Sequence, residues 1–173
     1  FELGVTPVGI ETYANSRRLE KSLRLQNADL EIDYNLYEAG LARPKVKAAD
    51  FHGKAAYVQQ RELDQQAAYL CTFMLQDTTD SDGVVRYPVG NWPILDRKTK
   101  EVIIDAHGRR SYTTSMAFGP SLGANIAMGY LPADQAKEGD IVLIEYFGEH
   151  YEAKVMKVGY GALLDPTNER PKS

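Results

Sequence analysis

The sequence predicts an α+β chain in which a mainly helical N-terminal part is followed by a small antiparallel β-barrel. Residues 1–64 contain two stretches rich in good helix formers, at 9–25 and 50–63. After residue 65, short segments of bulky, aromatic and β-branched residues alternate with turns that contain Gly, Pro or Asp. About six short strands over roughly 95 residues are typical of a closed or nearly closed barrel. We therefore expect two domains, 1–64 and 65–173.

The first predicted helix, residues 9–25, is apolar on two sides. Ile10, Tyr13, Ala14 and Leu25 fall on one side, and Leu19 and Leu23 fall nearly opposite. A helix of this kind usually packs between two layers. In that position Arg18 and Glu20 would be partly buried and would need polar partners. The second predicted helix begins after Asp50, a good N-cap residue, and ends near Leu63.

The β part begins with an apolar run at 67–75 and an Asp-rich loop at 77–83. Pro88, Gly90 and Pro93 then restrict any strand in 84–95 to a short or edge position. Near the C-terminus, Gly148-Glu149 separates two strands, and glycine at the first central position favours a type II′ hairpin. The polar tail from 165 onward is expected to wrap the surface. The remaining predicted strands lie at 102–104, 111–116, 126–131, 141–147 and 151–158.

Composition excludes several classes of protein. The 173 residues carry a net charge of −4 and no basic run longer than Arg109-Arg110, which argues against a nucleic-acid partner. No segment approaches the ~20 apolar residues of a membrane span, and no signal peptide is visible. The single cysteine, Cys71, lies in an apolar run and is expected to be a buried structural thiol. These features favour the cytoplasm or, in a eukaryote, the mitochondrial matrix.

Arg18, Glu20, Asp29 and Glu38 form the best chemical constellation, near the expected domain junction. Carboxylates and an arginine can bind a polar heterocycle through paired hydrogen bonds. The same residues can instead form a structural ion-pair network that ties the helix to the following turn, and spacing alone favours this interpretation. Two glycine-containing segments, 108–112 and 119–122, are candidates for contact with an anionic ligand, or turns with solvated charges.

No metal site is predicted. His52, His107 and His150 stand alone, without a ligand-like partner three or four residues away. The aspartates at 77–82 lack the spacing and the terminal glutamate of a calcium-binding EF-hand.

Four stretches of the N-terminal part form an ordered set: Ser16–Lys21, Asp29-Leu30, Glu38–Leu41 and Asp50–Ala56. They resemble the aminomethyltransferase family, that is, the glycine cleavage T-protein and its relatives. The family pattern is approximately S-x-R-L-E-K-G-Y-R, W-G-x-D-L, T-P-x-E-A-G-L and D-F-x-G-K-x-A. The lysine after Arg-Leu-Glu is more similar to the folate domains of dimethylglycine and sarcosine dehydrogenases and oxidases. Later segments resemble the C-terminal barrel of the same family, namely Gly119–Leu122, Ile126–Pro132, Phe147–Tyr151 and Asp165–Arg170.

The resemblance implies that residues 1–64 are the C-terminal part of a folate-binding lobe and that 65–173 are a T-protein-like barrel. It implies one-carbon transfer from a methylated amine to tetrahydrofolate, with Arg18, Glu20, Asp29 and Glu38 shaping the wall of the cofactor pocket. The family's catalytic aspartate lies in an upstream region that this chain lacks, so no catalytic residue is assigned here. FAD would belong only to a further upstream domain.

The first residue, Phe1, is not a methionine, and we expect a processed chain or a piece of a longer polypeptide. An upstream lobe or partner polypeptide, and an oligomer, are therefore expected. Departures from the family pattern occur at Ala14, where the T-protein has a folate-contacting arginine, and at Ser22, Gln26-Asn27 and Asn35-Leu36. They leave two alternatives open: a binding or structural subunit that keeps the scaffold, and a one-carbon transferase for another methyl donor.

Overall fold

The fold was analysed in a computed structural model that describes residues 2–42, 45–63, 65–87 and 89–169. The expected boundary at residue 64, the strand-limiting Pro88 and the end of the C-terminal tail lie outside these residues. Among the described residues, no helix has the length and apolar character needed to cross a bilayer.

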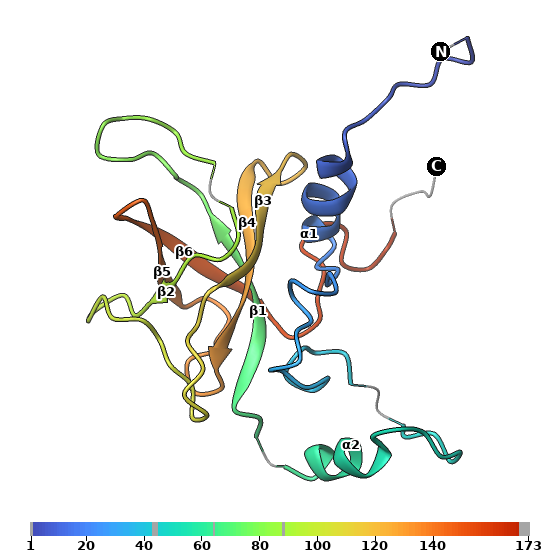
Figure 1. Cartoon of the computed structure of the whole chain (residues 1–173). Helices are drawn as coiled ribbons and strands as arrows, with labels where there is room; N and C mark the ends of the chain where they lie inside the picture. The colour runs from blue at the N-terminus through green and yellow to red at the C-terminus, as the bar shows by residue number, and fades with distance from the viewer. Residues whose placement is uncertain (1, 43–44, 64, 88, 170–173) are drawn as a thin grey trace.

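A six-stranded antiparallel sheet dominates the chain and curls into a barrel-like shape (Figure 1). Its spatial order is β2-β5-β6-β1-β4-β3. The strands are β1 Ala68–Leu75, β2 Ile94–Leu95, β3 Thr113–Gly119, β4 Ala124–Pro132, β5 Ile141–Tyr146 and β6 Glu149–Val158.

The two edge strands of the sheet meet, as the expectation of a closed or nearly closed barrel required. Thr113 N–H donates to the Trp92 carbonyl at 2.8 Å, and Ile94 N–H donates to the Ser111 carbonyl at 3.0 Å. Register shifts in β1, between Thr72 and Phe73, and in β3 bend the strands toward this closure.

The central strand β1 is buried on both faces, which explains its continuous apolar sequence. Phe73 and Leu75 point into the barrel, where they join Ile94, Ile144 and Val155 in the main core. Ala68 and Leu70 point outward, where they pack with Leu19, Ile126, Met128 and Tyr130. The N-terminal segment therefore covers the outer face of β1 and β4, and full burial of Leu19 contributes roughly 1.5–3 kcal/mol.

The first helix is shorter than predicted and packs on one side only. It comprises a π-helical stretch η1, Thr12–Arg17, and α1, Arg18–Glu20. Leu19 is fully buried against the barrel, whereas Ile10 and Tyr13 are 76% and 80% exposed. Among the described residues the expected packing between two layers is not found, because Leu19 packs against the barrel while Ile10 and Tyr13 on the other side stay exposed.

A Schellman motif ends the helix at Glu20 and not at Leu25. Ser22 takes a positive φ of 56°. Leu23 N–H then donates to the Arg18 carbonyl, and Ser22 N–H donates to the Leu19 carbonyl, both at 2.9 Å.

The second helix, α2, spans Lys54–Arg61 and has no buried residue. It lies below the barrel in Figure 1. The predicted N-cap, Asp50, is wrong: Gly53 occupies that position with φ 82°, a left-handed conformation that glycine adopts at little cost.

The β5–β6 hairpin also differs from its prediction. Tyr146 pairs with Glu149, so the two-residue loop is Phe147-Gly148 and not Gly148-Glu149. Both loop residues have positive φ, 52° and 78°, which is the type I′ pattern and not type II′.

Candidate functional site

Arg18 and Asp29 form a buried ion pair between the first helix and the loop that follows it. Arg18 Nη1 donates to Asp29 Oδ2 at 2.8 Å, and the two side chains are 9% and 0% exposed. The same carboxylate accepts Leu25 N–H at 2.9 Å and the Thr114 hydroxyl at 2.5 Å. Arg18 Nη2 donates to Ser115 Oγ at 2.7 Å. Both charges are thus neutralised and hydrogen-bonded, which burial requires.

The barrel reaches this ion pair through an irregularity in β3. Thr114 and Ser115 are consecutive, and in a regular strand their side chains would point to opposite faces. The register of β3 against β4 shifts between Thr113 and Ser115, which lets both hydroxyls turn toward the helix. Thr114 donates a hydrogen bond to Asp29, and Ser115 accepts one from Arg18, so β3 is hydrogen-bonded to both members of the ion pair.

An aromatic stack links this pair to a second charged cluster. Tyr130 on β4 donates from its hydroxyl to the Asp29 main-chain carbonyl at 2.8 Å. Its ring stacks on Tyr34, with centroids 3.5 Å apart, and the Arg109 guanidinium lies 4.2 Å from the centre of the Tyr34 ring. Burial raises the pKa of Tyr34 to about 12, so this tyrosine is neutral at physiological pH.

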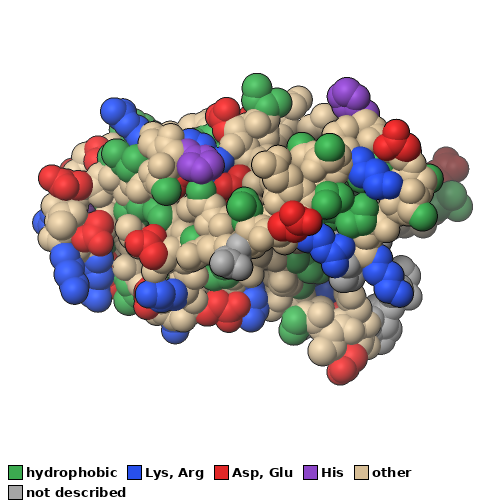
Figure 2. All heavy atoms as spheres, turned by 90° about the horizontal axis from the view of Figure 1, so that it is seen from below, with side chains coloured by type: hydrophobic (Ala, Val, Ile, Leu, Met, Phe, Trp, Pro, Cys, Tyr) green, Lys and Arg blue, Asp and Glu red, His purple; other side chains and the backbone are tan. Residues whose placement is uncertain are grey.

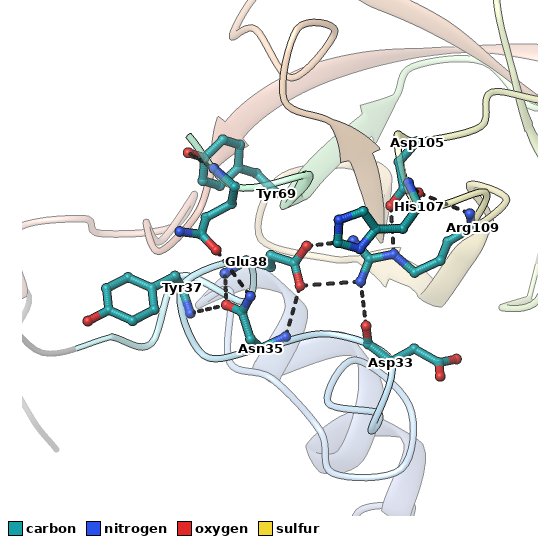
Figure 3. A network of polar contacts seen from close by, with 9 residues as sticks. Asp33, Asn35, Tyr37, Glu38, Tyr69, Asp105, His107 and Arg109 are labelled. Carbon is teal, nitrogen blue, oxygen red and sulfur yellow. Dashed lines mark hydrogen bonds and ion pairs between the residues drawn. The ribbon is translucent and has the colours of Figure 1, made fainter. Parts of the chain in front are cut away.

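Arg109 bridges the two carboxylates of Glu38 and Asp105 (Figure 3). Arg109 Nη2 lies 2.5 Å from Glu38 Oε1, and its Nε lies 2.6 Å from Asp105 Oδ2. Burial disfavours the charged forms, but the hydrogen bonds outweigh it: the pKa of Asp105 is lowered and the pKa of Arg109 is raised. Glu38 Oε2 also accepts Asn35 N–H at 2.9 Å, which fixes the turn before it.

Glu20 lies apart from this network and anchors two surface segments. Its carboxylate accepts Ser121 N–H at 2.6 Å, at the turn between β3 and β4. Its main-chain carbonyl accepts Leu163 and Leu164 N–H at 3.1 and 2.9 Å. The C-terminal tail is thereby held beside the first helix, as Figure 1 shows.

The structure thus brings Arg18, Asp29 and Glu38 into one connected network and places Glu20 outside it. The expected partial burial of Arg18 and Glu20 is confirmed, at 8% and 1% exposed. Sequence reasoning missed Arg109, which was expected in a turn with solvated charge or in contact with an anionic ligand. The four-residue spacing from Asp105 to Arg109 was a usable signal, but the pairing with Glu38 spans 71 residues.

Residues 88–158 match the family model of the glycine cleavage T-protein C-terminal barrel domain. They contain strands β2 to β6, that is, five of the six strands of the curled sheet; the central strand β1 lies before them. This part of the chain is therefore similar to the T-protein C-terminal barrel domain.

Relatives extend the similarity across the N-terminal segment. An aminomethyltransferase of Koribacter versatilis is 30% identical over 156 residues, covering 90% of this chain and 37% of that protein. The mitochondrial dimethylglycine dehydrogenase of Rattus norvegicus is 30% identical over 162 residues, covering 92% of this chain and 17% of that protein. The crystal structure of glycine cleavage system aminomethyltransferase T from Bartonella henselae shares the fold, with a TM-score of 0.65 and 24% identity. It is matched over 83% of this chain and 36% of its own. The chain therefore spans little more than a third of the aminomethyltransferase and of the solved structure, and about a sixth of the dimethylglycine dehydrogenase.

Three residues that depart from the aminomethyltransferase pattern lie in turns of this chain. Ser22 and Asn27 stand where the pattern has glycine, and both adopt positive φ, 56° and 63°. Ser22 also shares a 2.8 Å hydrogen bond with the Thr72 hydroxyl. Asn35 stands where the pattern has threonine, and its Oδ1 accepts Tyr37 and Glu38 N–H at 2.8 and 3.0 Å. Asn27 and Asn35 therefore suit the turns in which they lie.

Tetrahydrofolate is the ligand that the family implies. The four predicted residues do not offer free charges to it. The side-chain charges of Arg18, Glu20, Asp29 and Glu38 all point at atoms of this chain. Because each of these charges already has a partner within the chain, these four residues alone provide no unpaired donor set for a pterin ring. Among the described residues, no three His, Cys, Asp or Glu side chains are grouped to hold a metal ion.

Proposed function

We propose that this chain is the C-terminal portion of a tetrahydrofolate-dependent aminomethyltransferase-like enzyme that transfers one-carbon units. A demethylating amine dehydrogenase or oxidase of the dimethylglycine or sarcosine type is the favoured parent. The observation that carries the proposal is the extent of the similarity. It covers 92% of the chain against a dimethylglycine dehydrogenase and thus includes the charged N-terminal segment as well as the barrel.

In this proposal Arg18, Glu20, Asp29 and Glu38 are positioning residues of the cofactor pocket, and none transfers a proton. Arg18 and Asp29 fix the first helix on β3, and Glu38 fixes the 35–41 turn through Arg109. Tetrahydrofolate supplies the acceptor for the one-carbon unit when it is bound. The remaining walls and the catalytic aspartate would come from an upstream lobe or partner polypeptide. FAD, if used, would belong to that upstream part.

We also propose the division into 1–64 and 65–173 as the family's lobe and barrel, and an oligomeric parent. A cytoplasmic location, or the mitochondrial matrix in a eukaryote, accords with the compartment in the name of the rat relative.

Tetrahydrofolate titration tests the proposal. The chain carries one tryptophan, Trp92, and its fluorescence together with that of the tyrosines reports binding. The titration is run on this chain and on the complete protein that its gene encodes, or on the chain with its N-terminal partner restored. Binding by the longer form, weakened in Glu38→Gln and unchanged in the surface control Glu152→Gln, would support the proposal. Absence of binding in every form would end the folate assignment.

A specific observation favours a second candidate, a binding or structural subunit that keeps the scaffold without folate. Ala14 replaces the folate-contacting arginine of the T-protein pattern, and the charges of the four predicted residues already have internal partners. A one-carbon transferase for another methyl donor is the third possibility. Product analysis with methylated amines and thioethers separates it from the first.

A further inference from the structure

A small apolar cavity lies at the end of the molecule that carries α2, beside the turn that contains Glu38. Its volume is about 360 Å³, which lies within the usual range for small-molecule sites. The apolar side chains that line it come from the turn at 36–41 and from the segment leading into α2: Leu36, Leu41, Val46, Phe51 and Tyr57. Figure 2 looks onto this end of the molecule from below and shows hydrophobic side chains exposed beside Lys and Arg side chains.

Hydrogen bonds hold the first wall of the cavity in shape. Leu41 N–H donates to the Leu36 carbonyl at 2.8 Å, which brings these two side chains to the same turn. Gly40 allows the turn with φ 68°, and its Cα packs so closely on Gly159 that a methyl group would lie 2.7 Å from that residue. Because the turn is fixed against the main body of the chain, this wall exists before any ligand binds.

The second wall is an aromatic corner. Tyr57 on α2 lies 6.3 Å from the Phe51 ring and 5.0 Å from the Tyr37 ring, measured between centroids. Lys54 closes the loop before the helix, with Nζ donating to the Ala48 and Ala49 carbonyls at 2.8 and 3.2 Å. Leu36 and Phe51 nevertheless remain 48% and 38% exposed, so the corner leaves apolar surface uncovered.

Two cations stand at this apolar cavity. Lys45 and Lys47 both line it, and both are exposed. Among the described residues neither has a recorded ion pair, in contrast to Lys21 and Lys157, which pair with Asp165 and Glu138. The residues lining the cavity include no carboxylate. An apolar hollow with unpaired positive charge at its side is complementary to an amphipathic anion.

We propose that this cavity binds a small amphipathic carboxylate, with the apolar chain or ring between Leu41 and Phe51 and the carboxylate facing Lys45 and Lys47. The cavity shares the 36–41 turn with Glu38, but its lining includes none of the four residues proposed for the cofactor wall, so its binding can be tested separately from folate binding.

Three probes with the same ten-carbon chain test the charge preference: decanoate, decylamine and 1-decanol, each below its micelle concentration. Calorimetry with the complete chain is expected to show decanoate binding at least about ten-fold more tightly than decylamine. No binding of decanoate, or equal binding of decylamine, would overturn the proposal.

Charge reversal locates the site. Lys45→Glu/Lys47→Glu is expected to weaken decanoate binding by about ten-fold or more and to improve decylamine binding. The control Lys98→Glu/Lys100→Glu changes the net charge equally at an exposed turn elsewhere and is expected to leave both affinities unchanged.

Two further variants distinguish a loss of binding from a loss of folding. Lys45→Gln/Lys47→Gln removes the charges without introducing repulsion and should weaken decanoate but not decanol. Phe51→Ala should weaken decanoate and decanol alike. Far-UV circular dichroism checks the fold of each variant. Decanoate affinity that stays at the wild-type value in both lysine double variants, or in Phe51→Ala, would refute the site.

Discussion

Removing the buried carboxylate of Asp29 is the sharpest test of how the N-terminal segment is held on the barrel. Asp29→Ala deletes the acceptor of three donors at once: the Arg18 guanidinium, the Leu25 N–H and the Thr114 hydroxyl. Arg18 keeps the Ser115 hydroxyl and main-chain carbonyls as partners but loses the carboxylate with which it is paired.

The expected loss follows from burial. Asp29 is fully buried and Arg18 is 8% exposed, so water does not replace the missing carboxylate. Breaking a buried ion pair from one side typically costs about 3–5 kcal/mol, because the remaining charge is left uncompensated. That is a large part of the roughly 5–15 kcal/mol by which natural domains are stable. We expect a loss of about 3–5 kcal/mol in the free energy of unfolding.

Urea unfolding followed by Trp92 fluorescence measures this loss, with a surface ion pair as the matched control. Arg97 and Glu152 form a 2.6 Å pair whose side chains are 54% and 56% exposed. Such pairs contribute about 0–1 kcal/mol, so Glu152→Ala should barely move the unfolding midpoint.

The double variant Arg18→Ala/Asp29→Ala completes the test, because it removes both charges. If the ion pair is the cause, the double variant should be less destabilised than the sum of the two single variants. Additive losses, or a loss in Asp29→Ala no greater than in Glu152→Ala, would refute the reasoning.

Three other outcomes are expected. Gly40→Ala should lose about 1–3 kcal/mol or more in unfolding experiments, since its methyl group would meet Gly159 at 2.7 Å, whereas Gly53→Ala, with open space around it, should lose only the cost of its positive φ. Burial raises the pKa of the Cys71 thiol to about 12. Near pH 8 this thiol should therefore react with a disulfide reagent only as fast as the protein unfolds. Rapid labelling of the folded protein would contradict its burial. Although burial opposes it, hydrogen bonding lowers the pKa of Asp105 below its ordinary 3.8, so its stabilisation is present above that pH and lost as pH falls through the lower folded value. Asp105→Asn should therefore lose less stability than the wild type as the pH is lowered through and below 3.8, and an equal loss in both would contradict this role.

The fold class was predictable because short runs of sequence are enough to indicate a β-strand. The runs at 67–75, 126–131 and 151–158 combine bulky residues with clear turns, and they correspond to β1, β4 and β6. The ends of the helices were less predictable, because they depend on single residues at positive φ. Ser22 ends the first helix where helix propensity would continue it.

The residues of the candidate site could be named from the sequence, but their relations could not. Arg18, Asp29 and Glu38 lie in motifs that resemble a family pattern, and the structure buries all three. Their contacts with Ser115, Thr114 and Arg109 span 97, 85 and 71 residues, and no local pattern encodes such pairings.

By itself the sequence determined the secondary-structure class, the buried cysteine and the family resemblance, since each depends on residue types at short spacing. Only the tertiary structure decided that Arg18 and Asp29 form hydrogen bonds with the hydroxyls of two consecutive residues of β3. These hydrogen bonds require a register shift in a strand some ninety residues away. It also decided that Glu20 holds the β3–β4 turn and the C-terminal segment and lies outside the network. The physical reason is the same in both cases. A buried charge must be paired or hydrogen-bonded, and the fold of the chain decides which partners lie within reach.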